Sequence, residues 1–196
     1  RELFWREFYN YILFHFPNSQ FTNWNNLEIK WNENEDDFIN WCEGKTGVPI
    51  IDAAMIHVNN TGQMHNRLRM IVASFLTKNL FINWKKGEEY FAKKLLDYEV
   101  SSNVGSWQWS ASTGADAAPY FRVFNPYSQS EKFDKEGVFI KSVIPSLKDV
   151  DSKLLHIENG ASSNLFVQYP KSIVDIMLSR KDAIEKFKRA KRAYFN

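Results

Sequence analysis

At residues 61–70 the chain reads Thr61-Gly62-Gln63-Met64-His65-Asn66-Arg67-Leu68-Arg69-Met70, and at residues 103–110 it reads Asn103-Val104-Gly105-Ser106-Trp107-Gln108-Trp109-Ser110. Both stretches place amide, guanidinium or indole groups in segments that are otherwise apolar enough for a protein core. Buried polar groups of this kind must be paired with each other or with a ligand. Together the two stretches predict a cofactor pocket.

The first stretch opens a predicted helix with two different faces. Its apolar side chains recur every three or four residues, and they are Met64, Leu68, Ile71, Val72, Phe75 and Leu76. This stripe is expected to face the core. Asn66, Met70 and Ala73 lie on another side. With the neighbouring Arg69 they offer a surface on which a planar group can rest, although a polar helix start that faces solvent explains them equally well.

Helical spacing of apolar residues extends along nearly the whole chain. Helices are expected over 1–16, 34–44, 48–60, 63–83, 87–97, 129–143 and 172–194. No run of alternating β-branched residues is long enough to predict a sheet, so the expected fold class is all-α. The segment 98–128 lacks a clear amphipathic period and is expected to form short helices and loops packed against a ligand.

The composition fits a globular protein of one domain or two small ones, because hydrophobic residues make up 44% and aromatic residues 16% of 196 residues. The formal net charge of +2 arises from 25 basic and 23 acidic residues, so bulk charge provides no attraction to nucleic acid. The basic cluster at 186–192 can contact phosphate, but a solvated helix face is the favoured interpretation.

Compartment and metal content are predicted from what the sequence lacks. No signal peptide and no run of about 18 apolar residues is present, which favours a cytoplasmic protein that does not enter a membrane. The single Cys42 fits a reducing compartment and is interpreted as a packing residue. The four histidines lack metal-ligand spacing, so no metal is expected. The chain begins inside a helical pattern without an initiator Met, and we expect it to be a fragment of a longer protein.

The first predicted helix also carries a polar and aromatic face. Glu2, Trp5, Arg6 and Tyr9 are three or four residues apart and therefore share one side. Trp supplies a stacking plane and Arg a phosphate clamp, a pairing that suits an unstacked base. The alternative is an aromatic core stripe flanked by a Glu2–Arg6 pair, which spacing alone favours.

Several motifs carry a family resemblance. They are Glu2-Leu3-Phe4-Trp5-Arg6-Glu7-Phe8-Tyr9, Gly44-Lys45-Thr46-Gly47, Asp52-Ala53-Ala54-Met55, residues 64–76, Trp107-Gln108-Trp109 and residues 113–126. The chain resembles the carboxyl-terminal part of the helical FAD-binding domain of the photolyase and cryptochrome family, and within it bacterial photolyases that repair cyclobutane pyrimidine dimers. The match follows the family's order over residues 1–150. Residues 151–196 are expected to add a loop and a C-terminal helix to the same domain.

The resemblance implies a reaction and its participants. Reduced FAD, excited by blue light, gives an electron to a pyrimidine dimer in UV-damaged DNA, the cyclobutane ring splits, and the electron returns. The damaged pair must leave the duplex, which costs least where stacking is already weakened. A monomer is expected. The family's α/β domain, with its antenna chromophore, and the early helical segment that holds the FAD diphosphate are missing, so FAD binding is expected to be weak or absent in this fragment.

The resemblance also implies site residues. Glu2 matches the carboxyl group that hydrogen-bonds the dimer and stabilises its radical anion, and Trp5 and Trp109 match the indoles that receive it. Including these three, the expected DNA contacts are Glu2, Trp5, Arg6, Tyr9, Asn66, Arg67, Trp109 and Gln129. The expected cofactor contacts are Asn66, Arg69, Met70, Asp97, Tyr98, Glu99 and Asn103.

The resemblance also implies roles in the photochemistry for two groups of residues. Arg69 and Asp97 match an ion pair beside the isoalloxazine ring, and Asn103 matches the amide that faces flavin N5. The second group consists of Trp107, Trp84 and Trp31, which match the chain of indoles that carries an electron from the surface to the buried flavin.

Five positions depart from the family pattern. Gln63 stands where Trp is usual, and Glu99 replaces an Asp that is expected to bond the flavin imide edge. Tyr98, Val104 and Ser106 replace a Gly, an Asn and a Gly, which makes the segment around the ring bulkier.

Two other classes of function remain open at this point. A cryptochrome-like photoreceptor would use light to change the flavin redox state, and a partner would recognise the altered shape. A helical remnant would bind DNA without redox chemistry. Asn66, Met70, Asn103 and Trp109 favour repair, because signalling relatives often change these positions.

Overall fold

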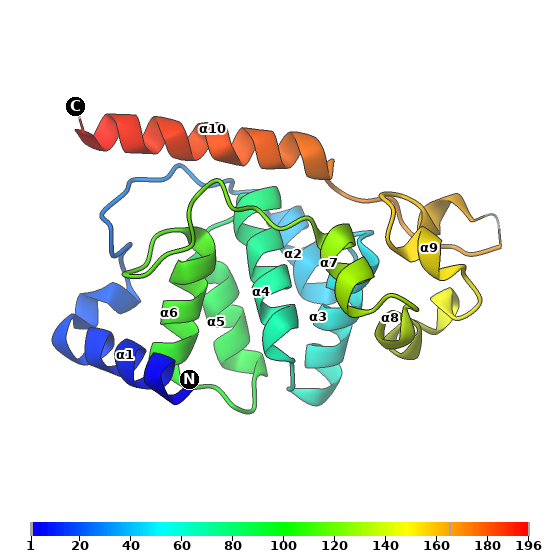
Figure 1. The fold of residues 1–196 in the computed structure, drawn as a ribbon, viewed down its shortest axis with the longest axis horizontal. Coiled ribbons are helices and arrows are strands. Elements are labelled where there is room, and N and C mark those ends of the chain that lie inside the picture. Colours follow the sequence, from blue (N-terminus) through cyan, green and yellow to red (C-terminus); the bar gives the residue numbers. More distant parts are fainter. Residues whose placement is uncertain (1, 165, 196) are drawn as a thin grey trace.

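The computed structural model describes residues 2–164 and 166–195, and within them the regular elements are all helical (Figure 1). The α-helices are α1 (Glu2–His15), α2 (Glu35–Glu43), α3 (Pro49–Thr61), α4 (Asn66–Ser74), α5 (Trp84–Lys94), α6 (Val100–Ala111), α7 (Pro126–Phe133), α8 (Val138–Val143), α9 (Ser152–Leu155) and α10 (Ile176–Phe195). Shorter turns are η1 (Pro17–Gln20), η2 (Phe75–Asn79), η3 (Pro145–Leu147) and η4 (Ala161–Ser163). The all-α prediction is confirmed. The first predicted helix was expected to begin at residue 1, which lies outside the described residues.

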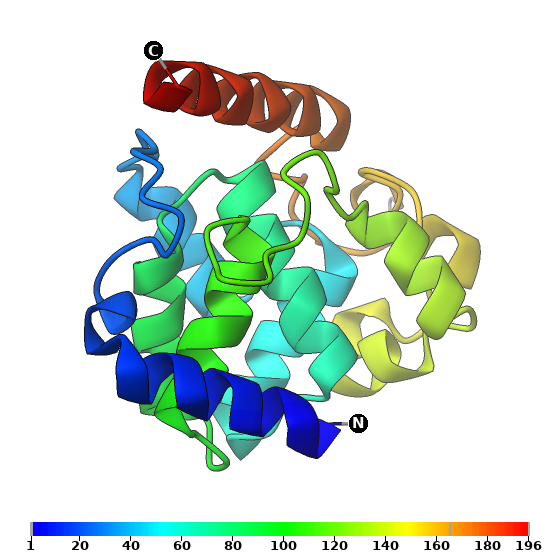
Figure 2. The same ribbon diagram turned by 60° about the vertical axis from the view of Figure 1, so that its left-hand side comes forward.

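The helices surround a main aromatic core, and α10 adds a smaller cluster with Phe81. α4, α5 and α6 stand side by side, α1 crosses one end of α6, and α10 runs along the opposite edge of the molecule (Figures 1 and 2). The largest fully buried side chains include Trp41, Trp84 and Trp107, and Phe75 and Phe91 lie among them. This packing fixes α6, which carries the polar stretch at residues 103–110, between three other helices.

Local sequence signals explain most helix boundaries. Asn34 caps α2, where its side chain accepts a hydrogen bond from the Asp37 backbone amide. Asn83 caps α5, where its side chain accepts a hydrogen bond from the Lys85 backbone amide. Gly44 ends α2 at φ +68°, where a Cβ would lie 2.7 Å from the Asp52 carbonyl oxygen. Because Asn83 is a cap, α5 begins three residues before the predicted start at 87.

Three predicted elements are wrong in length or continuity. The helix predicted over 63–83 begins only at Asn66, because His65 caps it, and it changes to a π-helical turn at η2. The helix predicted over 129–143 is two helices, α7 and α8, separated at Gly137 with φ +66°. The segment 98–128 contains the continuous twelve-residue helix α6. It lacks an amphipathic period because it packs against α1, α4, α5 and η2 at once.

A buried carboxylate holds the turn between α2 and α3. Asp52, 1% exposed, accepts hydrogen bonds from the backbone amides of Thr46 and Gly47 at 2.7 and 3.0 Å and from the Tyr169 hydroxyl. These donors compensate the burial of the carboxylate. The motif that joins Gly44–Gly47 to Asp52 is therefore structural here.

Lys78, in η2, is a buried amine that joins three elements. It is 1% exposed, its Nζ donates to Ser112 Oγ at the end of α6 at 2.7 Å, and it lies 3.7 Å from the centroid of the Phe187 ring on α10. Burial lowers the pKa of Lys78 from 10.5 to about 7. Its polar contacts within the described part of the chain are the Ala111 carbonyl and the Ser112 hydroxyl, so the ammonium form depends on dipoles and one aromatic ring.

The buried lysine makes stability depend on pH. Between the folded pKa of about 7 and the unfolded value of 10.5, the unfolded chain binds more protons at Lys78, so its contribution to stability rises with pH in that range. We expect Lys78→Met to remove this rise. The difference in melting temperature between the parent protein and the variant should change by a few degrees between about pH 6.5 and about pH 9.5. A constant difference would contradict the assignment.

None of the described helices combines the length and the apolarity that crossing a membrane requires. Cys42 is half-buried and packs against the core, as its interpretation as a packing residue requires.

Candidate cofactor and substrate pocket

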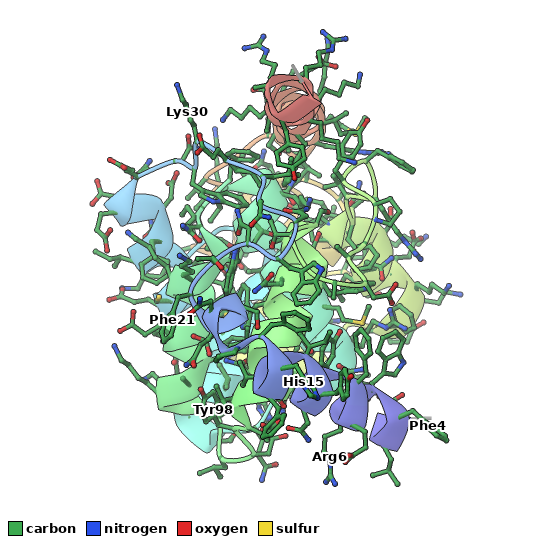
Figure 3. All side chains as sticks on the ribbon, turned by 90° about the vertical axis from the view of Figure 1, so that its left-hand side faces the viewer. Phe4, Arg6, His15, Phe21, Lys30 and Tyr98 are labelled. Atoms are coloured by element: carbon green, nitrogen blue, oxygen red, sulfur yellow. The ribbon has the colours of Figure 1, made fainter. Side chains whose placement is uncertain are left out.

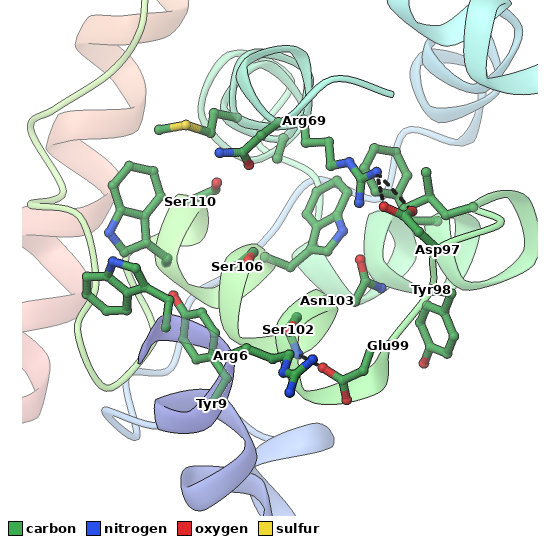
Figure 4. A pocket seen from close by; sticks show the side chains of 18 of the residues that line it. Arg6, Tyr9, Arg69, Asp97, Tyr98, Glu99, Ser102, Asn103, Ser106 and Ser110 are labelled. Carbon is green, nitrogen blue, oxygen red and sulfur yellow. Dashed lines mark hydrogen bonds and ion pairs between the residues drawn. The ribbon is translucent and has the colours of Figure 1, made fainter. Parts of the chain in front are cut away.

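A cavity of about 470 Å³ opens between α1, α4, α5, α6 and the connection from α5 to α6, and we call it the central pocket (Figure 4). Its volume lies in the range of small-molecule and cofactor sites. It is lined by Glu2, Trp5, Arg6, Tyr9, Asn66, Arg69, Met70, Ala73, Phe91, Leu95, Asp97, Tyr98, Glu99, Ser102, Asn103, Ser106, Trp107, Trp109 and Ser110. Helix α1 and the consecutive helices α4, α5 and α6, which follow it at a distance in the chain, therefore contribute to one site.

The pocket brings together most residues that the sequence singles out. All seven expected cofactor contacts line it, and so do Glu2, Trp5, Arg6, Tyr9 and Trp109 from the expected DNA contacts. Four expected site residues do not line it. Arg67 lies 4.7 Å from the Phe133 ring, Gln129 is half-buried on α7, and Trp31 and Trp84 lie elsewhere in the core.

The α1 wall of the pocket is not part of the core. No residue of α1 is buried, Trp5 remains 39% exposed, and Phe4 and Arg6 project from the helix (Figure 3). The alternative of an aromatic core stripe is therefore wrong, because α1 contacts the rest of the chain mainly through α6. Arg6 pairs weakly with Glu7, at 3.5 Å, and not with Glu2. The polar and aromatic face of α1 is left available to a ligand.

An ion pair closes one end of the pocket. The Arg69 Nη2 atom donates to both carboxylate oxygens of Asp97, at 2.9 and 2.8 Å, and its Nε donates to the Met64 carbonyl at 2.8 Å (Figure 4). Three hydrogen bonds fix the plane of the guanidinium. The pair joins α4 to the segment before α6 and leaves a rigid polar edge at the pocket.

Asn103 is held by a residue that the sequence analysis missed. Its Nδ2 donates to the Glu88 carbonyl oxygen at 3.1 Å and to Glu88 Oε1 at 2.9 Å. Both amide hydrogens are used in this way, so the amide presents its oxygen as the remaining acceptor. Burial raises the pKa of Glu88, while bonds from Asn103 and Tyr98 oppose that rise. The sequence offered one signal for Glu88: it follows the buried Trp84 by four residues and therefore lies on the same side of α5.

Glu99 has a structural role that its assignment to the cofactor did not include. It caps α6, where its two carboxylate oxygens accept hydrogen bonds from the amides of Ser101 and Ser102, both at 2.9 Å. Burial alone would raise the pKa of Glu99, but the hydrogen bonds from Ser102 and Ser101 lower it to about 2. A carboxylate at a helix N-terminus is also favoured by the helix dipole.

The three indoles of the expected electron path lie in connected parts of the core. Trp107 is 2% exposed, lines the pocket, and packs so closely on Gly87 that a Cβ there would lie 2.2 Å from its ring. Gly87 follows Trp84 by three residues on α5. The backbone pairing between Asn32 and Ile82 brings Trp31 to the segment just before Trp84. Trp107 also contacts Trp41, with ring centroids 6.0 Å apart.

Within the described residues, no three His, Cys, Asp or Glu side chains converge in a way that would hold a metal ion. The pocket offers instead aromatic faces, a fixed guanidinium, amide groups and hydroxyl groups. These are the groups that hold a planar heterocycle or an unstacked base.

Fold and pocket together define an all-helical domain built around a cofactor site. A protein-family model described as "FAD binding domain of DNA photolyase" matches residues 1–189 of the sequence. The chain therefore belongs to this family. The resemblance inferred from the motifs is confirmed.

Individual relatives agree with this assignment. A deoxyribodipyrimidine photo-lyase of Vibrio cholerae is 50% identical over 194 residues, which are 97% of this chain and 41% of that protein. A class III photolyase structure from Agrobacterium tumefaciens has a TM-score of 0.90 and 41% identity, covering 97% of this chain and 42% of that one. A cryptochrome structure from Synechocystis has a TM-score of 0.86 and 35% identity. The match covers 94% of this chain and 40% of the cryptochrome chain. The chain spans about two fifths of the length of these proteins.

Proposed function

We propose that the protein to which this chain contributes its FAD-binding domain splits cyclobutane pyrimidine dimers in UV-damaged DNA with light. The observation that carries the proposal is one cavity, lined at the same time by Trp5 and Trp109, by the Arg69–Asp97 pair and by Asn103. A site for a planar cofactor and a site for an unstacked base therefore share a wall. A photo-lyase relative at 50% identity supports the same reaction.

The residues of the pocket fit FAD. Arg69 and Asp97 offer a fixed polar edge, the Asn103 amide oxygen offers an acceptor, and Phe91 and Trp107 supply apolar surface for a ring system. When bound, reduced FAD supplies the light-excited electron that opens the dimer. A neutral amide such as Asn103 does not readily give a proton to a ring nitrogen, because it is not an acid near pH 7. Glu88 keeps that amide in one orientation.

The substrate end of the pocket lies on α1 and α6. We propose that Trp5 and Trp109 receive the extruded dimer by stacking, and that Glu2 donates or accepts a hydrogen bond at its base edge. Asn66 and Met70 line the same pocket from α4, and we propose that they lie between this end and the cofactor end. Extrusion costs a few kcal/mol and costs least at a base pair that damage has already unstacked.

Charged and polar side chains outside the dimer subsite would contact the DNA backbone. Arg6 lies at the pocket rim with a 58% exposed side chain, and Arg67 and Gln129 lie on α4 and α7. Such contacts position the duplex and carry no sequence information. This fits a repair protein that recognises damage in any sequence.

We propose that Trp107, Trp84 and Trp31 form the path by which an electron from outside reaches the cofactor. The close packing of Trp107 on α5 and the pairing of Asn32 with Ile82 support this order. We also propose a monomeric, cytoplasmic protein, and that the 196-residue chain alone retains FAD weakly. Stoichiometric, tightly bound FAD in the isolated chain would contradict the last point.

A blue-light photoreceptor is the second candidate, and the likeness to the Synechocystis cryptochrome favours it. Illumination of the full-length protein with a dimer-containing oligonucleotide separates the candidates. A repair enzyme restores the pyrimidines only in light. A photoreceptor reduces its flavin without opening the ring, and a DNA-binding remnant does neither.

Glu2→Ala tests the proposed role of the pocket carboxylate. A hydrogen bond that strengthens as charge develops on the substrate acts on the reaction more than on binding. We expect the quantum yield of repair to fall roughly threefold or more, while dimer affinity changes little. Glu7→Ala is the matched control, because Glu7 lies on the same helix, is 70% exposed and does not line the central pocket. An unchanged quantum yield in Glu2→Ala would remove the assigned role.

A further inference from the structure

Three serines face the central pocket at intervals of four residues along α6. They are Ser102, Ser106 and Ser110, and they form one row on the pocket side of the helix (Figure 4). The Ser102 hydroxyl is engaged with the Glu99 carboxylate. Ser106 is exposed to the pocket, at one of the positions where this chain departs from the family pattern.

Ser110 is a buried residue whose hydroxyl opens onto the pocket and has no protein partner among the residues that the structure describes. It is 6% exposed and lines the pocket, and no hydrogen bond is formed by its side chain. A hydroxyl inside a helix usually donates to the carbonyl four residues earlier. Thr61 and Thr77 do so in this molecule, both at 2.8 Å. Ser110 does not, and its hydroxyl is left facing the cavity.

The position of Ser110 selects which part of a ligand it meets. It follows Trp109 directly and lies seven residues beyond Asn103, which is about 10 Å along the helix axis. Ser110 therefore belongs to the end of the pocket where Trp5 and Trp109 offer stacking surfaces. A hydroxyl that faces a pocket without a protein partner is free to bond a ligand that enters. A stacked pyrimidine supplies one, because its edge carries carbonyl oxygens and an N–H group.

We propose that the Ser110 hydroxyl hydrogen-bonds the base edge of the pyrimidine dimer held by Trp5 and Trp109, and is a specificity-determining residue for damaged DNA. This inference rests on the proposed repair function. It adds a polar contact at the substrate end that is separate from Glu2 and from the cofactor contacts.

The test is dark binding by the full-length, FAD-loaded protein, measured by fluorescence anisotropy. The probes are one oligonucleotide with a single thymine cyclobutane dimer and the same oligonucleotide undamaged. We expect Ser110→Ala to weaken binding of the damaged probe by roughly fivefold to tenfold, the loss of one hydrogen bond, with no change for the undamaged probe. Ser110→Cys, which keeps the size but donates weakly, should weaken binding similarly. Ser142→Ala is the matched control, because Ser142 is an exposed residue of α8 outside the central pocket and its hydroxyl donates to the Phe139 carbonyl.

Each outcome decides the inference. Equal affinity of Ser110→Ala and the parent protein for the damaged probe would overturn it. A loss of affinity together with loss of bound FAD would also overturn it and would assign Ser110 to the cofactor. If the parent protein itself does not prefer the damaged probe, the proposed repair function fails independently of Ser110.

Discussion

Trp107→Phe is expected to suppress photoreduction of the bound flavin by at least about tenfold, equivalent to about 1.4 kcal/mol in barrier. Trp107 is the one indole of the proposed path that lines the central pocket, and its ring packs directly on α5 at Gly87. Phenylalanine fills much of the same space but is far harder to oxidise than indole. The electron path is therefore interrupted at the step next to the cofactor, while the shape of the core is largely kept.

Repair by the chemically reduced Trp107→Phe variant should remain close to that of the parent protein, since the path serves only to reduce the cofactor. Trp24→Phe is the control, because Trp24 is an indole outside the central pocket that packs on Phe16. The measurement is the rate of flavin bleaching under blue light with an external thiol. Equal bleaching rates in Trp107→Phe and the parent protein would refute the path.

Arg69→Met should raise the Kd for FAD roughly tenfold to a hundredfold, the loss of one or two charge-assisted hydrogen bonds. The fold should be nearly unaffected. Asp97 is 65% exposed, and ion pairs at that exposure contribute about 0–1 kcal/mol to stability. The geometry, with both carboxylate oxygens and the Met64 carbonyl bound to one guanidinium, therefore serves the pocket more than the fold.

Lys93→Met is the matched control for Arg69→Met. It breaks an exposed ion pair in which Lys93 Nζ lies 2.6 Å from Glu89 Oε1. This pair lies outside the central pocket. Bound FAD per protein after gel filtration, together with the melting temperature, gives the comparison. Retention of FAD by Arg69→Met at the level of the control would contradict the role of the pair.

Several elements could be predicted from the sequence because their signals are local. Apolar periodicity gave the helices, and caps such as Asn34 and Gly44 set their ends. Helix α6 was not predicted as one element, because a helix packed on all sides has no polar stripe to mark it. The break at Gly137 was missed because the Asp134 side chain, which accepts hydrogen bonds from the amides of Phe139 and Ile140, starts α8 anew.

The residues gathered at the pocket were predictable where a motif carried them, as with Arg69 and Asn103. Residues that act through another side chain were not. Glu88 is recognisable only once its hydrogen bonds to Asn103 are known, and Glu99 caps a helix that had not been predicted. The Ser110 hydroxyl makes no hydrogen bond to the preceding turn of α6 or to any other described residue. Only the structure reveals this, because the sequence does not show how a serine side chain is oriented.

The central claim is that one cavity brings the cofactor against the damaged base pair. The fluorescence lifetime of the bound, reduced flavin tests it most directly, because electron transfer to a dimer in contact competes with emission. We predict a marked shortening of the lifetime when the full-length protein is saturated with a thymine-dimer oligonucleotide, and none with the undamaged strand. An unchanged lifetime at saturating damaged DNA would contradict a shared cavity.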